Sequence, residues 1–314
     1  MRKVLPLRGT VATEHSAGRL IALHTVVALL ITASMALAGN RIIVDDLGLK
    51  IRVKDNISRI VSLVPTNSEM VCLLDCARLK GGTRYDRFPA ELNKRVHANQ
   101  IEIIGGGFDA NLEKIVRLQP DLVLTNGPTQ QRFAVPLKNM GYPVLSIWPR
   151  DMAGLTRDFL LLGQLLAQEK KAKSAIDDMQ RRFALIQAKA MNKPKKKVYL
   201  QMWTNPLITA GKLSFPDWVV AAAGGINIFG DLPFDSAQVS LESIIQRDPE
   251  VLIFLAEQEP FVKTLAKRRA WSTIRGVRQS HFCFIEETDI RRSIHFLDGL
   301  AKIQDCLFGE KRVN

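Results

Sequence analysis

The sequence predicts an α/β protein in which two lobes with largely parallel sheets are joined by one long helix. Strands and helices alternate in both halves of the chain, and an uninterrupted helical pattern separates the halves. A segment of similar sequence also occurs twice, as "NLEKIVRLQPDLVLT" at residues 111–125 and "SLESIIQRDPEVLIF" at residues 240–254. Each copy has a helix-capping residue, a Glu two positions later, a Pro and an apolar strand, so we interpret the repeat as an equivalent unit of each lobe.

Residues 1–38 have the features of a secretory signal peptide. Basic residues precede an apolar run at residues 20–38, which ends in the A-x-A pattern Ala-Leu-Ala. We predict cleavage after Ala38 and a periplasmic location for the mature protein. The alternative is an uncleaved membrane anchor, because the run is just long enough to span a bilayer.

The composition excludes several classes of protein. A chain of 314 residues that is 46% hydrophobic can bury a large core and is long enough for about two domains. Its net charge of +13 is compatible with binding to nucleic acid, to a membrane surface or to an anionic ligand. Export, and the absence of basic runs interleaved with aromatic residues, argue against nucleic acid. The 5 His residues have no metal-binding spacing, so we predict no metal site and no cofactor.

The first lobe is predicted at residues 39–150. Its Val, Ile and Leu residues form short runs between Gly, Pro and helical segments, which is typical of buried parallel strands. Pro65 ends one strand, and Thr66 or Asn67 is the expected cap of the next helix. The expected elements are two short strands within 41–53, strands at 60–64, 79–83, 101–104, 121–125 and 143–148, and helices ending at 74 and spanning 111–118 and 130–140.

Residues 151–192 are predicted to be the linking helix. The stretch from Met152 to Met191 has no Pro, and its apolar residues recur at helical spacing. We expect one long helix, or two helices joined end to end, with a length above ~50 Å at ~1.5 Å per residue. Such a helix would be a rigid spine between the lobes and would permit only small closure.

The second lobe is predicted at residues 193–314, where the alternation of strands and helices resumes. A helix that ends in two glycines and the second copy of the repeat are its clearest elements. The expected elements are strands at 198–203 and 281–287, a helix at 215–225, the helix–strand unit at 240–254 and a closing helix at 290–307.

The segment "GGGFDA" at residues 105–110 fits the glycine pattern of dinucleotide-binding sites, which leaves an NAD-dependent enzyme as an alternative function. Two observations argue against it. Asn111 is the better helix cap, so the glycines belong to a loop before the helix, and no acidic residue follows the next strand where a ribose would lie. An exported protein also rarely meets NAD. We therefore predict a protein that is not an enzyme.

Four segments resemble the periplasmic binding proteins that serve ABC importers of iron–siderophores, haem and cobalamin, with the strongest likeness to the cobalamin-binding members. The segments are "RIVSLVPTNSEM", "NLEKIVRLQPDLVL", "KKKVYLQMWTNPLITAGK" and "AAGGINIF…QVSLESII". The resemblance covers about residues 45–306 and implies the class III periplasmic-binding-protein fold, with two Rossmann-like lobes. It also implies a monomer that captures a metal chelate between its lobes and delivers it to an ABC permease dimer with its ATPase.

The resemblance implies a function for the Glu of each repeated segment. At the positions of Glu113 and Glu242, the family has acidic residues that meet arginines on the two halves of the permease dimer. Two exposed carboxylates, one on each lobe, are well suited to a two-fold symmetric basic surface. The alternative is that each Glu only stabilises the first turn of its helix through the helix dipole.

The resemblance also indicates which residues line the ligand cleft. It implies that Tyr85 stacks on the ligand and that Asp289 contacts it. The cobalamin-binding members have tryptophans where this chain has Gly107, Asn126 and Ser236, and Trp203 is the candidate replacement. The predicted ligand-binding residues are Arg84, Tyr85, Arg87, Asn126, Trp203, Asp289, Arg291 and Arg292.

Arginines are concentrated in these predicted cleft loops. They are Arg84, Arg87, Arg150, Arg291 and Arg292. Guanidinium groups suit an anionic, oxygen-rich ferric chelate, so a ferric siderophore is the favoured ligand and a corrinoid is the other main possibility. Haem is a third possibility, because a Tyr such as Tyr85 can coordinate haem iron.

The four cysteines are expected to behave as two different pairs. The resemblance implies a disulfide in the second lobe, in which Cys306 matches one partner while the other position is Ala223. Cys283 is a candidate substitute, and whether it pairs with Cys306 is left open. Cys72 and Cys76 lie one helical turn apart, where a disulfide is geometrically awkward, so we predict two buried thiols.

Overall fold

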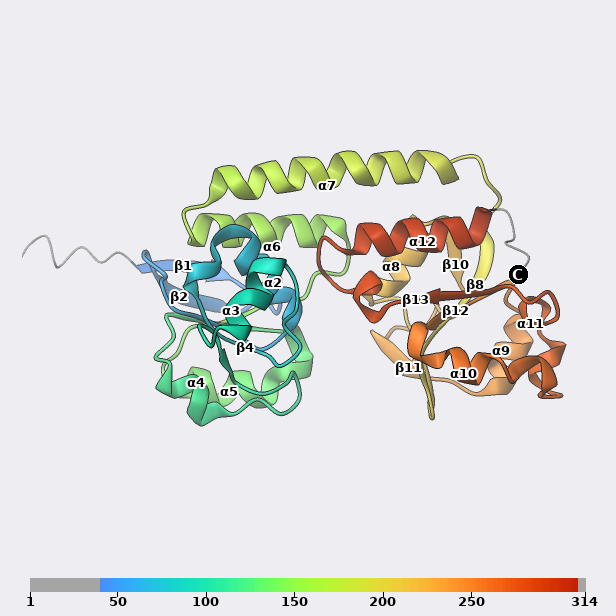
Figure 1. Ribbon diagram of the computed structural model, residues 1–314, viewed down its shortest axis with the longest axis horizontal. Helices are drawn as coiled ribbons and strands as arrows, with labels where there is room; N and C mark the ends of the chain where they lie inside the picture. The colour runs from blue at the N-terminus through green and yellow to red at the C-terminus, as the bar shows by residue number, and fades with distance from the viewer. Residues whose placement is uncertain (1–39, 310–314) are drawn as a thin grey trace, which may run out of the picture.

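The computed structural model describes residues 40–309, and Figure 1 shows two α/β lobes side by side beneath one long helix. The predicted signal peptide lies outside the described residues. Within residues 40–309, no helix is both long enough and apolar enough to cross a membrane. The predicted two-lobed α/β architecture is confirmed.

The N-terminal lobe is built on a five-stranded parallel sheet. From one edge to the other its strands are β5 (Glu102–Ile103), β4 (Leu79–Gly82), β3 (Ile60–Ser62), β6 (Leu122–Thr125) and β7 (Val144–Ser146). A separate antiparallel hairpin consists of β1 (Asn40–Val44) and β2 (Lys50–Lys54), as predicted. The central strands are buried along their whole length, as expected for a parallel sheet with both faces covered.

Helices cover this sheet on both faces. They are α2 (Pro65–Asp75), α3 (Ala90–His97), α4 (Leu112–Arg117) and α5 (Gln131–Asn139), of which α3 was not predicted. The side chain of Asn111 caps α4 as expected, accepting a hydrogen bond from the backbone N of Lys114 at 2.9 Å. The predicted cap of α2 is wrong, because the helix begins at Pro65, whose fixed φ suits the first helical position.

The linking region consists of two helices that lie side by side rather than end to end. The chain reverses direction between α6 (Met152–Leu165) and α7 (Glu169–Ala190), where Ala167 has a φ of +52°. Gly163 permits the close contact, because a Cβ there would lie 2.5 Å from the Cβ of Ala172. The expected continuous span of residues 151–192 is therefore wrong, and α7 alone is the long helix that extends over both lobes (Figure 1).

The C-terminal lobe has a six-stranded sheet in which β8, β10, β12 and β13 are parallel. Its strands are β8 (Lys196–Thr204), β9 (Leu207–Ala210), β10 (Gly225–Asn227), β11 (Ser236–Gln238), β12 (Val251–Leu255) and β13 (Phe282–Ile285). Its α-helices are α8 (Phe215–Ala222), α9 (Leu241–Arg247), α10 (Glu259–Val262), α11 (Arg275–Arg278) and α12 (Phe296–Phe308). The closing helix starts later than predicted, because Glu287–Ile290 forms a separate 3-10 turn.

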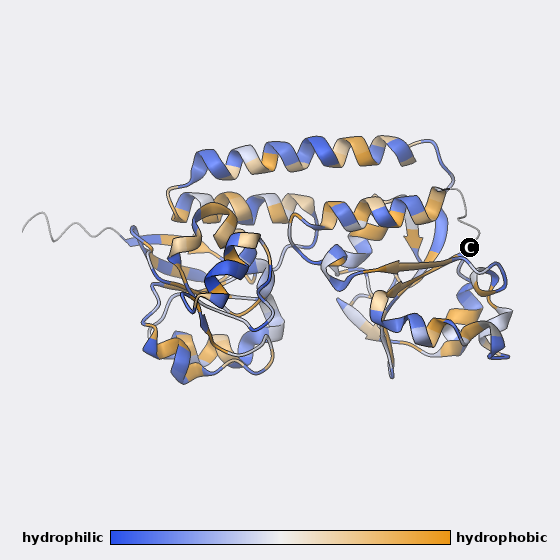
Figure 2. Cartoon of the chain, viewed as in Figure 1, coloured by the Kyte–Doolittle hydropathy of each residue, from blue (hydrophilic) through white to orange (hydrophobic). Residues whose placement is uncertain are grey.

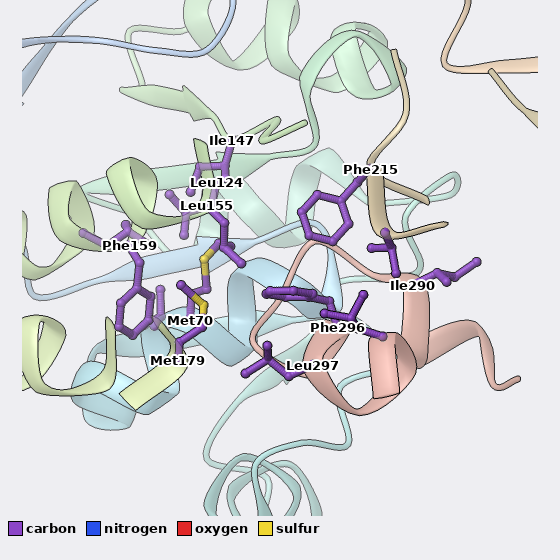
Figure 3. Packing of buried hydrophobic residues seen from close by; sticks show 14 of the residues in the cluster. Met70, Leu124, Ile147, Leu155, Phe159, Met179, Phe215, Ile290, Phe296 and Leu297 are labelled. Atoms are coloured by element: carbon purple, nitrogen blue, oxygen red, sulfur yellow. The ribbon is translucent and has the colours of Figure 1, made fainter. Parts of the chain in front are cut away.

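One apolar cluster continues from the N-terminal lobe beneath α7 into the C-terminal lobe. Figure 3 shows Met70 and Phe159 at one side of this cluster and Phe215 and Phe296 at the other. Most of α7 is hydrophilic, as Figure 2 shows, and its buried residues form a narrow stripe. The stripe consists of Ala172, Ile176, Met179 and Phe183. The two lobes therefore share a core along the spine.

Both cysteine pairs form disulfides. Cys283 in β13 pairs with Cys306 in α12, with their Cα atoms 6.1 Å apart, so the candidate substitute is the partner. Cys72 also pairs with Cys76, and the prediction of two thiols is wrong. Helix α2 ends at Asp75, whose φ of −156° and ψ of 89° turn the chain before Cys76, so the two cysteines do not lie on one continuous helix.

Candidate ligand-binding cleft

A cavity of about 360 Å³ lies between the two lobes. The N-terminal lobe lines it with loops that follow β3, β4, β5 and β6, so the cavity opens at the carboxyl ends of the parallel strands, where ligands commonly bind in such folds. Apolar side chains form much of its wall, among them Val64, Phe108, Met202 and Ile290. Phe108 was missed in the sequence because its exposed side chain has no periodic pattern around it.

A second cavity of about 630 Å³ adjoins the first and shares Pro65, Tyr85 and Arg291 with it. More charged side chains line it than line the first. The residues that distinguish it are Glu69, Arg87, Asp289, His295, Asp298 and Lys302. Charged side chains therefore line both cavities, and Tyr85 and Arg291 lie where the two meet.

Three of the predicted ligand-binding arginines are paired with carboxylates. Arg84 contacts Asp109 at 2.6 Å, with both side chains largely exposed. Arg291 pairs with Glu287. Arg292 contacts Asp235 at 2.7 Å. Because each positive charge has its own partner, these arginines do not present free cations to the cleft.

Arg292 connects the two lobes at the wall of the first cavity. Its guanidinium carbon lies 3.8 Å from the ring centroid of Trp148, and its Nε donates to the carbonyl oxygen of Pro149 at 3.1 Å. Burial lowers the pKa of Arg292, while Asp235 opposes that shift. The side chain thus bridges the segment after β7 and the C-terminal lobe, a contact that no local sequence pattern predicts.

The predicted residues other than Arg291 and Arg292 fall into three groups according to the cavity that they line. Tyr85 lines both cavities with a half-exposed ring, and Asn126 lines the first cavity. Asp289 and Arg87 line the second cavity, where Asp289 accepts from the Nζ of Lys302 at 2.7 Å. Arg84 and Trp203 line neither of these cavities. Trp203 follows Met202 in β8, and successive side chains in a strand point to opposite faces.

The second cavity holds a buried acid that the sequence analysis missed. The side chain of Glu69 in α2 is almost fully buried, and burial raises its pKa to about 8, although Ser293 and Arg291 oppose the shift. Its Oε1 lies 3.8 Å from the Nε2 of His295, and neither atom has a hydrogen-bond partner within residues 40–309. The ring of His295 packs edge-on against that of Phe88, with centroids 3.7 Å apart.

The two repeated Glu residues occupy equivalent positions on the two lobes. Glu113 and Glu242 lie in the first turns of α4 and α9, and both side chains are exposed. Helices α4 and α9 both lie on the side of the molecule away from α7 (Figure 1). In the part of the chain that the structure describes, neither Glu forms an ion pair. The glycines of residues 105–110 lie in a loop before the capping residue Asn111.

Comparison with known proteins identifies the family. The family model for periplasmic binding proteins matches residues 60–288. The chain is 31% identical to a vitamin B12-binding protein of Salmonella typhi over 209 residues, which are 65% of this chain and 75% of the relative. It is 27% identical to that of Photorhabdus laumondii over 203 residues, covering 64% and 72% of the two chains.

Solved structures share the fold. The periplasmic vitamin B12 binding protein of Vibrio cholerae has a TM-score of 0.70 at 21% identity, covering 80% of this chain and 96% of that one. A periplasmic heme-binding protein of Roseiflexus has a TM-score of 0.67 at 20% identity, covering 81% of this chain and all of that one. The matched family, the related sequences and the two-lobed structure agree, and the chain belongs to the periplasmic binding protein family.

Proposed function

We propose that this chain binds a corrinoid in the cleft between its lobes and delivers it to an ABC permease that works with an ATPase. The observation that carries the ligand class is the pairing of the two arginines that line the first cavity, because Arg291 and Arg292 are already engaged by Glu287 and Asp235. An anionic ferric chelate would have to compete with those carboxylates. The apolar wall beside Tyr85 instead suits a large, mostly uncharged ligand, and related sequences are vitamin B12-binding proteins.

The docking surface of this proposal consists of Glu113 and Glu242. Both carboxylates are exposed and both lie on the side of the molecule away from α7, so one flat partner could contact the two lobes together. Bidentate contacts with permease arginines would fix the register of the complex. The protein acts as a monomer exported to the periplasm, with cleavage after Ala38 and the lobes at residues 39–150 and 193–314.

Isothermal titration calorimetry of residues 39–314 tests the ligand class. Cyanocobalamin is expected to bind saturably with a dissociation constant of about 1 μM or less. Ferric hydroxamate siderophores, haem and NAD serve as comparison ligands. Binding of a siderophore in preference to cyanocobalamin would overturn the corrinoid proposal and show that the paired arginines open for an anion. Binding of haem alone would favour coordination of iron by Tyr85.

A further inference from the structure

The side chain of Gln130 joins three loops of the ligand cleft. Its Nε2 donates to the carbonyl oxygen of Leu63 at 2.9 Å and to that of Gly107 at 2.8 Å. Its Oε1 accepts from the backbone N of Asn126 at 2.8 Å. These three partners belong to the loops that follow β3, β5 and β6, and Gln130 itself lies at the wall of the first cavity. One side chain therefore connects the loops that form the N-terminal side of the cleft.

Glutamine suits this position because its amide carries two N–H donors and an acceptor on one planar group. Gln130 is only 1% exposed, and both of its donors and its oxygen are used within the protein. A carboxylate would have no donor for the two carbonyl oxygens, and an apolar side chain would leave all three backbone groups without this partner. The amide cannot be reversed either, because the end that faces two carbonyl oxygens must carry the donors.

Phe108 depends on one of these connections. It lies in the loop after β5 and lines the first cavity with a ring that is 75% exposed. The carboxylate of Asp109 closes a turn around it by accepting from the backbone N of Gly106 at 2.8 Å. Gln130 holds the carbonyl group immediately before Phe108. Because the ring is largely exposed, its position is set mainly by the backbone of this turn rather than by packing around the ring.

We propose that Gln130 is a positioning residue, which holds the Phe108 ring at the wall of the cleft so that the wall is formed before the ligand arrives. A ligand that meets a preformed wall loses less free energy to the ordering of loops, so its affinity is higher. Gln130 acts through the backbone of the loops and does not itself bind the ligand. The inference rests on the proposed function, because it takes the first cavity as the place where the ligand binds.

Hydrogen–deuterium exchange of residues 39–314 without ligand tests the positioning directly. Gln130→Met keeps the length of the side chain and removes all three hydrogen bonds, so exchange in residues 104–111 and 126–130 is expected to accelerate by about tenfold or more. Gln130→Glu keeps an acceptor for the backbone N of Asn126 but has no donor when ionised, so its acceleration is expected mainly in residues 104–111. Circular dichroism melting confirms that each variant is folded.

Gln304→Met is the matched control. Gln304 in α12 is also buried, and its Nε2 donates to the carbonyl oxygen of Ile186 at 2.8 Å. It lines neither cavity of the cleft. This variant is expected to lose stability, as Gln130→Met does, but to keep the wild-type exchange of the cleft loops and the wild-type affinity for cyanocobalamin. The control separates the positioning of the cleft wall from a general loss of stability.

A double-mutant cycle with Phe108→Ala tests whether Gln130 acts through Phe108. Calorimetry at pH 7 is expected to show that Gln130→Met and Phe108→Ala each bind cyanocobalamin about tenfold more weakly than the wild type. In the Phe108→Ala background, Gln130→Met is expected to weaken binding by only about twofold more, because the ring that Gln130 positions is already absent.

The results distinguish this inference from the proposed function. Wild-type exchange in both Gln130 variants, or affinity losses that multiply fully in the double variant, would overturn the positioning role and leave the corrinoid proposal intact. Failure of cyanocobalamin to bind the wild type would overturn the corrinoid proposal. In that case the exchange of residues 104–111, which is measured without ligand, still decides whether Gln130 holds the wall in place.

Discussion

The guanidinium of Arg292 lies over the indole ring of Trp148, although the two residues belong to different lobes. The same guanidinium contacts Asp235 at 2.7 Å and the carbonyl oxygen of Pro149. An arginine at the wall of the ligand cleft therefore has a structural partner on each side. We expect that this arginine holds the lobes in a fixed relation.

Replacement of Arg292 is expected to destabilise the protein. Arg292→Ala removes a buried cation and leaves Asp235 without its partner, so we expect the free energy of unfolding to fall by about 1–3 kcal/mol. Urea denaturation followed by circular dichroism measures the change. Arg84→Ala is the control, because the Arg84–Asp109 pair is exposed and is expected to contribute much less. Equal losses in the two variants would contradict the lobe-bridging interpretation.

Replacement of both docking residues is expected to separate binding from transport. Glu113→Ala combined with Glu242→Ala removes both exposed carboxylates without touching the cleft. We expect corrinoid affinity to stay within about twofold of wild type and uptake to fall by about tenfold or more. Radiolabelled uptake by cells and calorimetry provide the two readouts.

The control for docking is Glu169→Ala. Glu169 is also an exposed Glu in the first turn of a helix, but that helix is α7 on the other side of the molecule. Uptake by this variant is expected to match the wild type. Normal uptake by the Glu113 and Glu242 double variant would show that these residues only stabilise their helices.

The buried Glu69 is expected to make stability depend on pH. Its folded-state pKa of about 8 is above the ordinary value of 4.5, so the folded protein binds this proton more tightly than the unfolded chain does. The free energy of unfolding therefore falls as the pH rises from about 4.5 to about 8. Glu69→Gln is expected to match the wild type near pH 4.5 and to exceed it by on the order of 3–5 kcal/mol above pH 8. Unfolding curves of the wild type and of Glu69→Gln at pH 5, 7 and 9 measure this difference. A difference in the free energy of unfolding that is the same at all three pH values would exclude the effect.

The disulfide between Cys283 and Cys306 is expected to stabilise the C-terminal lobe. It joins β13 to α12 across a sequence separation of 23 residues. Replacing both cysteines with Ser is expected to lower the free energy of unfolding by about 3 kcal/mol, because the unfolded chain gains loop entropy. The Cys72–Cys76 disulfide closes a much shorter loop, so its replacement is expected to cost less. Urea denaturation compares the two double variants, and a larger loss in the second would contradict the entropic argument.

The sequence predicts the parallel sheet of the N-terminal lobe well because its strands are apolar runs with clear boundaries. In the C-terminal lobe β9, β10 and β11 were not predicted. The caps at Asn111 and Ser240 were predictable, since each side chain acts within its own helical turn. The reversal before α7 was not predictable in the same way. It depends on Ala167 in a left-handed conformation, which Ala rarely adopts, and on the contact of Gly163 with Ala172.

The site was predicted less well for a physical reason. Residue types indicated that Arg291 and Arg292 would reach the cleft, and they do. The charge partner of Arg292 could not be read from the chain, because Asp235 is 57 positions away. The partner of Arg291 is Glu287, at the i,i+4 spacing. Glu69 lies in a helix whose neighbouring residues are mostly buried, and only the packed structure shows that its carboxyl is buried as well.

We infer that helix α7 restricts how far the two lobes can move apart during ligand exchange. It packs against α6 over one lobe and against α12 over the other, so bending it would break contacts at both ends. We therefore expect ligand entry to require no large hinge motion and the association rate constant to be governed by diffusion into the cleft. We consequently expect selectivity among related chelates to lie in their dissociation rate constants. The association rate constant is expected to fall in simple proportion to solvent viscosity.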